Sequence, residues 1–138
     1  MRLVLSVAIV LVSTSAYAQC LHGPDETAEQ AARRRAALTA TRTVNIIQAN
    51  QPLARNGVFL PQLQLAVSPY ALAMARSRDE ATAKINLEPD QDILPGWKLT
   101  LDVTEKGYWF MIQDKTDKCG FAYISNQNGI IYPATYLQ

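Results

Sequence analysis

The sequence predicts an α+β domain in which one long N-terminal helix packs on a C-terminal antiparallel meander of about four strands. Two observations lead to this prediction. No glycine or proline interrupts the alanine-rich stretch from residue 25 to residue 51, which favours a helix. From residue 97 to residue 132, short runs of alternating apolar and polar residues are separated by short turns, which is typical of an antiparallel sheet. A helix laid over such a sheet gives the α+β class.

Residues 1–18 are predicted to be a cleavable secretory signal peptide. Arg2 gives a positive start, residues 3–12 are almost wholly apolar, and Ala16-Tyr17-Ala18 places small residues where a signal peptidase reads them. The apolar run is shorter than the roughly 20 residues that span a membrane. A membrane anchor or a core helix is the alternative, and a lipoprotein is disfavoured because Gln19 precedes Cys20. We therefore expect a single domain, residues 19–138, that is periplasmic or secreted.

The mature chain is expected to carry no net charge. Loss of Arg2 leaves 12 basic and 12 acidic residues. A neutral chain offers no electrostatic basis for binding nucleic acid or an acidic membrane surface. No apolar stretch after residue 18 is long enough to cross a membrane. We expect neither a nucleic-acid partner nor a membrane span in the mature chain.

The two cysteines, Cys20 and Cys119, are predicted to form a disulfide. An even cysteine count in an exported protein favours pairing, and two cysteines allow one intramolecular pairing. The bond would tie the mature N-terminus to the C-terminal region. A zinc site is disfavoured because two sulfurs and the single His22 do not make a tetrahedral set of ligands.

The long helix is predicted to begin near Asp25 or Thr27 and to reach about Gln51. Thr27 and Gln30 have the spacing of a capping box. The second half of the helix has a narrow apolar face for packing on the sheet, formed by Ala37, Ala40, Val44 and Ile47. The first half, with its arginine run at residues 33–35, is expected to be solvated rather than to bind an acidic partner.

Residues 52–96 are predicted to be short helices and loops. Pro52 ends the long helix. Residues 58–65 are expected to be irregular or to form a short helix, and Ser68-Pro69 marks the start of another. A short strand is expected around Ile85 and Leu87.

The alternation in the C-terminal part predicts four strands, at residues 97–103, 108–113, 121–125 and 130–132. Asn128-Gly129 is typical of a hairpin turn, and Pro133 is expected to end the last strand. The aromatic residues of these strands are expected in the core rather than in a ligand groove. Trp109 is the exception, because it is out of phase with its neighbours and is expected to be exposed or covered by loops.

Several motifs, in order, resemble the globular domain of type IV pilins and type II secretion pseudopilins. Residues 37–50 are similar to the pilin helix with its Arg-Thr-Ile-Asn core, and residues 56–63 to the link that follows it. Residues 107–110 resemble a Gly-Tyr-x-Phe strand, and residues 121–132 the closing hairpin. The resemblance covers roughly residues 30 to 134 and implies a pilin-like fold.

One departure limits what the resemblance implies. Pilins keep an apolar N-terminal helix that begins Phe-Thr-Leu-Ile-Glu after prepilin peptidase cleavage, and this segment is not found here. Filament assembly in the usual way is therefore not implied. Some pseudopilins bind calcium at a comparable C-terminal loop, which makes Asp114 and Asp117 candidate ligands. Without an EF-hand pattern we expect these acids to be solvated and no metal to be bound.

No catalytic residues are predicted. His22 is the single histidine and is expected at the surface of a leader that ends in Gly23-Pro24, with no fixed nucleophile or acid beside it. We therefore predict no cofactor and no enzyme. The first hypothesis is an exported, non-enzymatic, pilin-like accessory or interaction protein whose protein partner the sequence does not identify. The alternative is a small periplasmic protein that binds a ligand or calcium.

Overall fold

The structure is a computed structural model that describes residues 20–77 and 79–136. The predicted signal peptide, residues 1–18, lies outside the described residues. In chain order the elements are α1 (Ala28–Asn50), the 3-10 helix η1 (Ala54–Asn56), α2 (Gln62–Ala66), α3 (Pro69–Ala75), α4 (Glu80–Ala83), β1 (Asp92–Leu94), β2 (Trp97–Thr104), β3 (Gly107–Asp114), β4 (Ala122–Asn126) and β5 (Ile131–Ala134).

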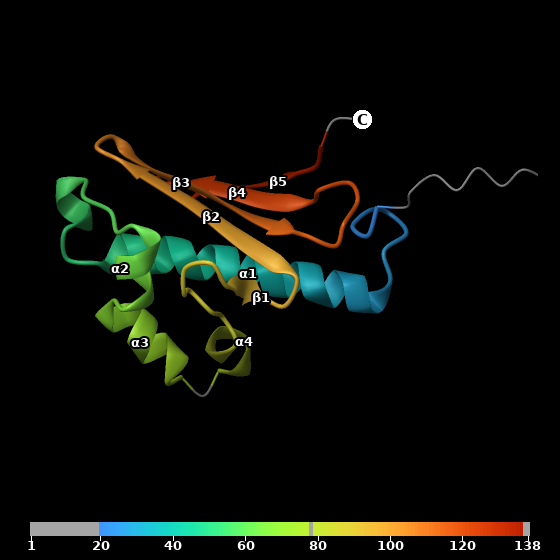
Figure 1. The fold of residues 1–138 in the computed structure, drawn as a ribbon, viewed down its shortest axis with the longest axis horizontal. Helices are drawn as coiled ribbons and strands as arrows, with labels where there is room; N and C mark the ends of the chain where they lie inside the picture. The colour runs from blue at the N-terminus through green and yellow to red at the C-terminus, as the bar shows by residue number, and fades with distance from the viewer. Residues whose placement is uncertain (1–19, 78, 137–138) are drawn as a thin grey trace, which may run out of the picture.

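The five strands form one antiparallel sheet in the order β1-β2-β3-β4-β5, so that each strand pairs with its neighbours in sequence. Helix α1 runs along one face of the sheet, and α3 and α4 lie on the side of α1 away from most of the sheet (Figure 1). Helix α2 overlaps the end of α1 in this view. The predicted α+β class, with a long helix and an antiparallel meander, is confirmed. The finer description needs correction, because the sheet has five strands and α1 contacts α3 and α4 as well as β4.

Local signals set both ends of α1. Thr27 accepts a hydrogen bond from the backbone N–H of Gln30, and the Gln30 side chain accepts one from the N–H of Thr27, which completes the predicted capping box. At the other end, the N–H of Gln51 bonds to the carbonyl of Ile47, and Pro52 follows. The predicted helix is therefore confirmed to within a residue at its C-terminal end.

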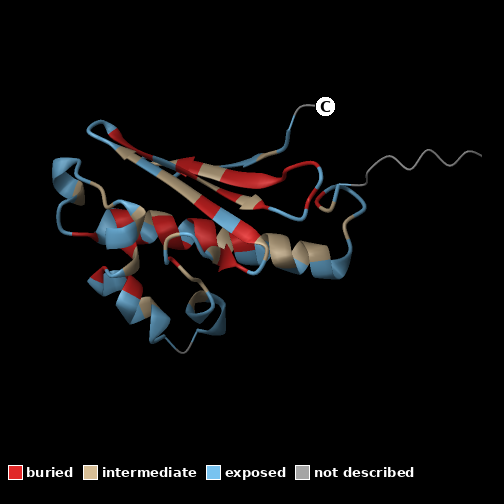
Figure 2. Ribbon diagram, in the orientation of Figure 1, coloured by how far each residue is buried: buried red, intermediate tan, exposed pale blue. Residues whose placement is uncertain are grey.

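The core lies between the second half of α1 and the inner face of the sheet (Figure 2). The predicted apolar face of α1 is fully buried at Ala37, Ala40, Val44 and Ile47. Opposite it lie the fully buried side chains of Phe110 and Ile112. In the register of the sheet, Trp109 falls on the other face, and its side chain is 43% exposed. We call this second face the outer face, and within the described residues no helix covers it.

Asn45 connects α1 to the sheet by hydrogen bonds to two strands. Its Nδ2 donates to the hydroxyl of Ser125 at 2.8 Å, and its Oδ1 accepts from the hydroxyl of Tyr108 at 3.0 Å. Burial raises the pKa of Tyr108 to about 12, so this hydroxyl is a proton donor at neutral pH. These bonds fix the position of the helix along the sheet.

Two local predictions were wrong. The expected strand around Ile85 and Leu87 is absent from the described chain, where residues 80–83 form α4 and the extra strand is β1. Pro133 lies within β5 instead of ending it. A proline is tolerated there because β5 is an edge strand, whose outward side needs no N–H donor.

Candidate functional site

Two regions at the surface of this fold concentrate unusual side chains. The first is where residues 20–26 meet residues 114–121, the end of β3 and the loop before β4, and we call it the N-terminal closure. The second is an apolar groove at the C-terminal end of α1. The structure brings most of the sequence-predicted candidates together in the first region.

A disulfide between Cys20 and Cys119 crosses the N-terminal closure, as predicted. The two Cα atoms lie 5.3 Å apart, within the ordinary range for a disulfide. The carboxylate of Asp117 reinforces this link. It accepts hydrogen bonds from the backbone N–H groups of Leu21 at 2.9 Å and Phe121 at 2.9 Å, so one side chain holds both sides of the closure.

His22 is buried in this region, which corrects the predicted surface position. Its side chain is 1% exposed. The ring centroid lies 4.8 Å from that of Phe121 and 5.4 Å from that of Trp97. Its Nε2 lies 2.9 Å from Oδ2 of Asp114, and its Nδ1 lies 3.5 Å from Oε2 of Glu26. His22 therefore anchors the leader to the core, while Gly23 and Pro24 stay exposed.

Asp114 is the centre of a polar network. Besides His22, its fully buried carboxylate accepts hydrogen bonds from the guanidinium of Arg33 at 3.3 Å and from the N–H and hydroxyl of Thr116 at 2.9 Å and 2.6 Å. Burial by itself raises the pKa of this carboxyl. The hydrogen bonds of Thr116 and His22, with the charge of Arg33, outweigh burial and leave the pKa below its ordinary value.

The arginine run at residues 33–35 is only partly solvated, which corrects the expectation for this stretch. Arg33 reaches Asp114, and Arg34 makes a bidentate ion pair with Glu26. The hydrogen bonds of Arg34 are the largest cause of the lowered pKa of Glu26. Arg35 is exposed.

The N-terminal closure has the composition of an active site but the geometry of a structural network. The expectation that Asp114 and Asp117 are solvated was wrong, because their side chains are buried and their oxygens accept hydrogen bonds from the protein. Oxygens committed in this way are poor ligands for a calcium ion, which needs six to eight of them. Within residues 20–77 and 79–136, no group of three or more His, Cys, Asp and Glu side chains is arranged to hold a metal.

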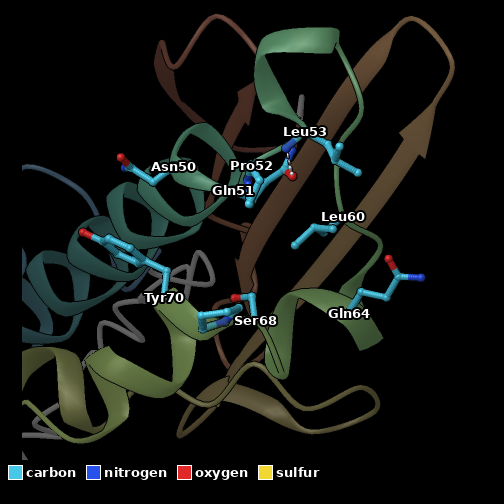
Figure 3. A pocket seen from close by; sticks show the side chains of 9 residues that line it. Asn50, Gln51, Pro52, Leu53, Leu60, Gln64, Ser68 and Tyr70 are labelled. Atoms are coloured by element: carbon cyan, nitrogen blue, oxygen red, sulfur yellow. Dashed lines mark hydrogen bonds between the residues drawn. The ribbon is translucent and has the colours of Figure 1, made fainter.

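The apolar groove is the second candidate. It has a volume of about 460 Å³ and lies between the end of α1, η1, the start of α2 and the start of α3 (Figure 3). In Figure 3, Leu60 points into the space between these elements, and Tyr70 reaches from α3 toward the last turns of α1. The full lining is Asn50, Gln51, Pro52, Leu53, Leu60, Gln64, Ser68, Pro69 and Tyr70.

Gln48 of α1 and Gln51, the residue that follows the helix, hold the loop that lines the groove. The Gln48 amide donates to the carbonyl of Leu60 at 2.7 Å and accepts from its N–H at 2.9 Å. The Gln51 amide donates to the carbonyl of Val58 and accepts from the N–H of Leu53 at 2.9 Å. These bonds satisfy the backbone of the loop at Leu53, Val58 and Leu60. Phe59 and Leu60 also pack against the core, whereas Leu53 and Val58 stay about half exposed.

Exposed apolar side chains are concentrated in the part of the sequence that contains the groove, and Leu53 and Tyr70 line it. Among the described residues, seven of the eleven large exposed apolar side chains fall between residues 46 and 72: Ile46, Leu53, Val58, Leu63, Val67, Tyr70 and Leu72. The surrounding sequence is almost uncharged, since Arg55 is the single charged residue from Thr43 to Ala75. An exposed apolar patch is typical of interaction sites in soluble proteins.

The comparisons with known proteins assign this chain to no family. No protein-family model, curated protein or solved structure matches the chain. The pilin-like resemblance therefore stays a prediction. Among the described residues no helix has the length and apolar character required to cross a membrane.

Sequence reasoning missed the groove and the role of His22. The partners of His22 and Arg33 are 92 and 81 residues away, and no local pattern links them. The groove did have a signal in the sequence, the uncharged stretch from Thr43 to Ala75. Pro52 and Pro61 interrupt regular secondary structure in this stretch. Its apolar side chains therefore lack one continuous helix or strand face through which all of them could be buried.

Proposed function

We propose that this chain is an exported, non-enzymatic interaction protein that binds an uncharged, apolar segment of a partner protein in the apolar groove. The observation that carries the proposal is the groove itself, a concave apolar surface in a stretch with a single charge. A site of this size has room for a few apolar side chains, which are the usual anchors of protein interfaces.

The charge distribution argues for an uncharged occupant. A charged side chain entering the groove would lose its hydration without gaining a partner of opposite charge, which is strongly unfavourable. Two polar side chains of the lining already donate hydrogen bonds within the chain. The amide of Asn50 donates to the backbone carbonyl of Ile46, and the hydroxyl of Ser68 donates to the backbone carbonyl of Leu65. Gln64 and Tyr70 remain at the rim to bond to the backbone of a bound segment.

The disulfide supports the exported part of the proposal. Structural disulfides persist in oxidising compartments and are rare in the cytosol. The Cys20–Cys119 bond is surrounded by the ordered N-terminal closure, which favours a structural role over a redox one. Together with the predicted signal peptide, it leads us to propose a periplasmic or secreted protein.

The pilin-like part of the proposal is supported by the order of elements. A long N-terminal helix lies along one face of an antiparallel meander whose strands follow one another in sequence. A protein with this fold, released from its signal peptide, would act as an accessory subunit that contacts other proteins rather than as a subunit held by a retained apolar helix.

The surroundings of His22 support a non-enzymatic role. A general acid or base must reach a bound substrate. The imidazole of His22 is buried against the rings of Trp97 and Phe121, and its Nε2 is engaged by Asp114. We therefore assign this network to holding the leader in place.

Selection from a library of displayed random peptides, on the purified exported protein with its disulfide intact, tests the proposed function. We expect enrichment of peptides that share an uncharged, apolar consensus. Leu53→Asp places a charge in the lining at a side chain that is 49% exposed, so it should weaken the selected peptides by about tenfold or more.

Ile130→Asp is the matched control, because Ile130 is 52% exposed and lies in the β4–β5 connection, outside the groove. It should leave peptide affinity unchanged. Enrichment of charged peptides, no enrichment at all, or equal losses in the two variants would each overturn the proposal.

A further inference from the structure

A second hollow, separate from the apolar groove, lies where the β2–β3 hairpin meets the end of β4. It has a volume of about 220 Å³, and Trp109 lines it together with polar side chains of both connections. Trp109 is also the exposed aromatic residue that the sequence singled out and that the proposed function does not use. The hollow therefore needs an explanation of its own.

The indole of Trp109 is held in place although it is exposed. Its Nε1 donates to Oδ2 of Asp102 on the neighbouring strand at 3.1 Å. Asp102 and Trp109 are directly paired in the register of β2 and β3. Because the N–H of the indole is committed to Asp102, what the ring offers to a ligand is its π face, at little further cost in conformational entropy.

Hydrogen-bonding groups without a partner surround this ring. Within residues 20–77 and 79–136, the ammonium of Lys106, the Nδ2 of Asn126 and the side-chain amide of Gln127 bond to no other protein group. Asn126 is directly paired with Trp109 in the register of β3 and β4. The hollow therefore combines an aromatic face, amide groups with unused hydrogen-bonding capacity and one ammonium group.

Gly107 gives Gln127 its place at the hollow. The backbone of Gly107 has φ of +147°, and a Cβ atom there would lie 2.6 Å from the amide carbon of Gln127. A side chain at residue 107 would therefore push Gln127 away from the hairpin. The close approach keeps the amide of Gln127 beside the hollow that Trp109 lines.

We propose that this hollow binds one acidic pyranose unit of a glycan, a sugar ring that carries a carboxylate. The C–H face of a pyranose is weakly positive and fits against the negative face of an indole. The Nδ2 of Asn126 supplies a donor, and the side-chain amide of Gln127 supplies a donor and an acceptor, for ring hydroxyls. Lys106 is the one charged residue of the lining, so a carboxylate is the substituent that complements it.

This inference does not depend on the proposed function. The apolar groove is lined by residues 50–70, and the hollow by residues 104–109 and 126–127. A protein that binds a partner in the first could bind a glycan in the second, and failure at either site leaves the other untouched.

Two methyl glycosides of nearly the same shape provide the test, methyl β-D-glucuronide and neutral methyl β-D-glucoside. Each is titrated into the isotope-labelled exported protein while NMR follows the indole signal of Trp109 and the side-chain amide signals of Asn126 and Gln127. We expect saturable shifts confined to these signals, with the glucuronide binding about three- to tenfold more tightly than the glucoside.

Three variants assign the contacts. Lys106→Gln should bring the affinity for the glucuronide down to that for the glucoside, and Trp109→Ala should weaken both sugars by about tenfold, followed on the amide signals. Tyr132→Ala is the matched control, because Tyr132 is an exposed aromatic residue on the outer face, two strands away and outside the hollow, and it should change nothing.

Absence of saturable shifts with either sugar would overturn the proposal. Equal affinity for the two sugars, unchanged by Lys106→Gln, would overturn the acidic part of it. Equal losses in the Trp109 and Tyr132 variants would show that the shifts come from general aromatic surface rather than from this hollow.

Discussion

The two ends of α1 are built in opposite ways. Near its N-terminal end, the closure uses charged and polar side chains, and it buries them: His22, Asp114 and Asp117 are each no more than 7% exposed. Near its C-terminal end, the groove uses apolar side chains, and it leaves them exposed, with Leu53 at 49% and Tyr70 at 39%. Each end therefore reverses the usual rule for where polar and apolar residues lie.

The contrast between the two ends of α1 suggests different roles for them: the closure stabilises the fold, and the groove is the proposed binding site. The buried carboxylates of the closure, Asp114 and Asp117, accept hydrogen bonds from within the chain, so their arrangement is explained by stability. Leu53 and Tyr70 of the groove are exposed and lie outside the hydrophobic core of the described chain, so core packing does not explain them. The proposed binding site therefore rests on exposed apolar surface and not on chemically reactive residue types.

Removal of the disulfide should have the largest effect on stability, because this bond closes the N-terminal closure. The Cys20→Ser, Cys119→Ser double variant frees the ends of a loop of 98 residues, which lowers the free energy of unfolding by about 4–5 kcal/mol in the chain-entropy model. Urea unfolding of the variant measures the loss, and reduced wild type is the control that should match it. A loss below about 1 kcal/mol would mean that the closure does not constrain the chain.

Asp114→Asn should have the next largest effect. The variant removes a buried charge that faces His22 and Arg33, with an expected loss of about 2–4 kcal/mol at neutral pH. The pKa of Asp114 is lowered on folding, so its contribution is present above the unfolded-state pKa of about 3.9 and is lost as pH falls through the lower folded-state pKa.

Urea unfolding of wild type and variant between pH 7 and the acid range checks both parts of this prediction. The wild type should lose stability on acidification more steeply than Asp114→Asn. Parallel curves would show that this carboxyl does not couple folding to pH, and the closure would then be held by the disulfide and Asp117 instead.

Leu53→Asp should have the smallest effect on stability. Its side chain is half exposed in the free protein, so the free energy of unfolding should change by no more than about 0.5 kcal/mol. The same variant is expected to weaken peptide binding about tenfold or more, as proposed above. A large loss of stability in this variant would place the groove among the structural elements and remove the contrast between the two ends of α1.

The sequence by itself determined the features that depend on near neighbours. The capping box of Thr27 and Gln30, the buried face of α1 and the alternation of β2 and β3 each follow from residues a few positions apart. The N-cap of α3 at Ser68 follows from the same kind of signal. Such features are local because helix and strand periodicity decide which side chains share a face.

Only the tertiary structure decided which of the remaining residues matter. His22 was expected at the surface because its neighbours are Gly23 and Pro24, but its surroundings come from Trp97, Asp114 and Phe121. The groove likewise needs α1, η1 and α3 to meet before its apolar residues enclose a volume. The physical reason is the same for both, since burial and concavity are properties of surfaces brought together from distant parts of the chain, and no short window of sequence contains them.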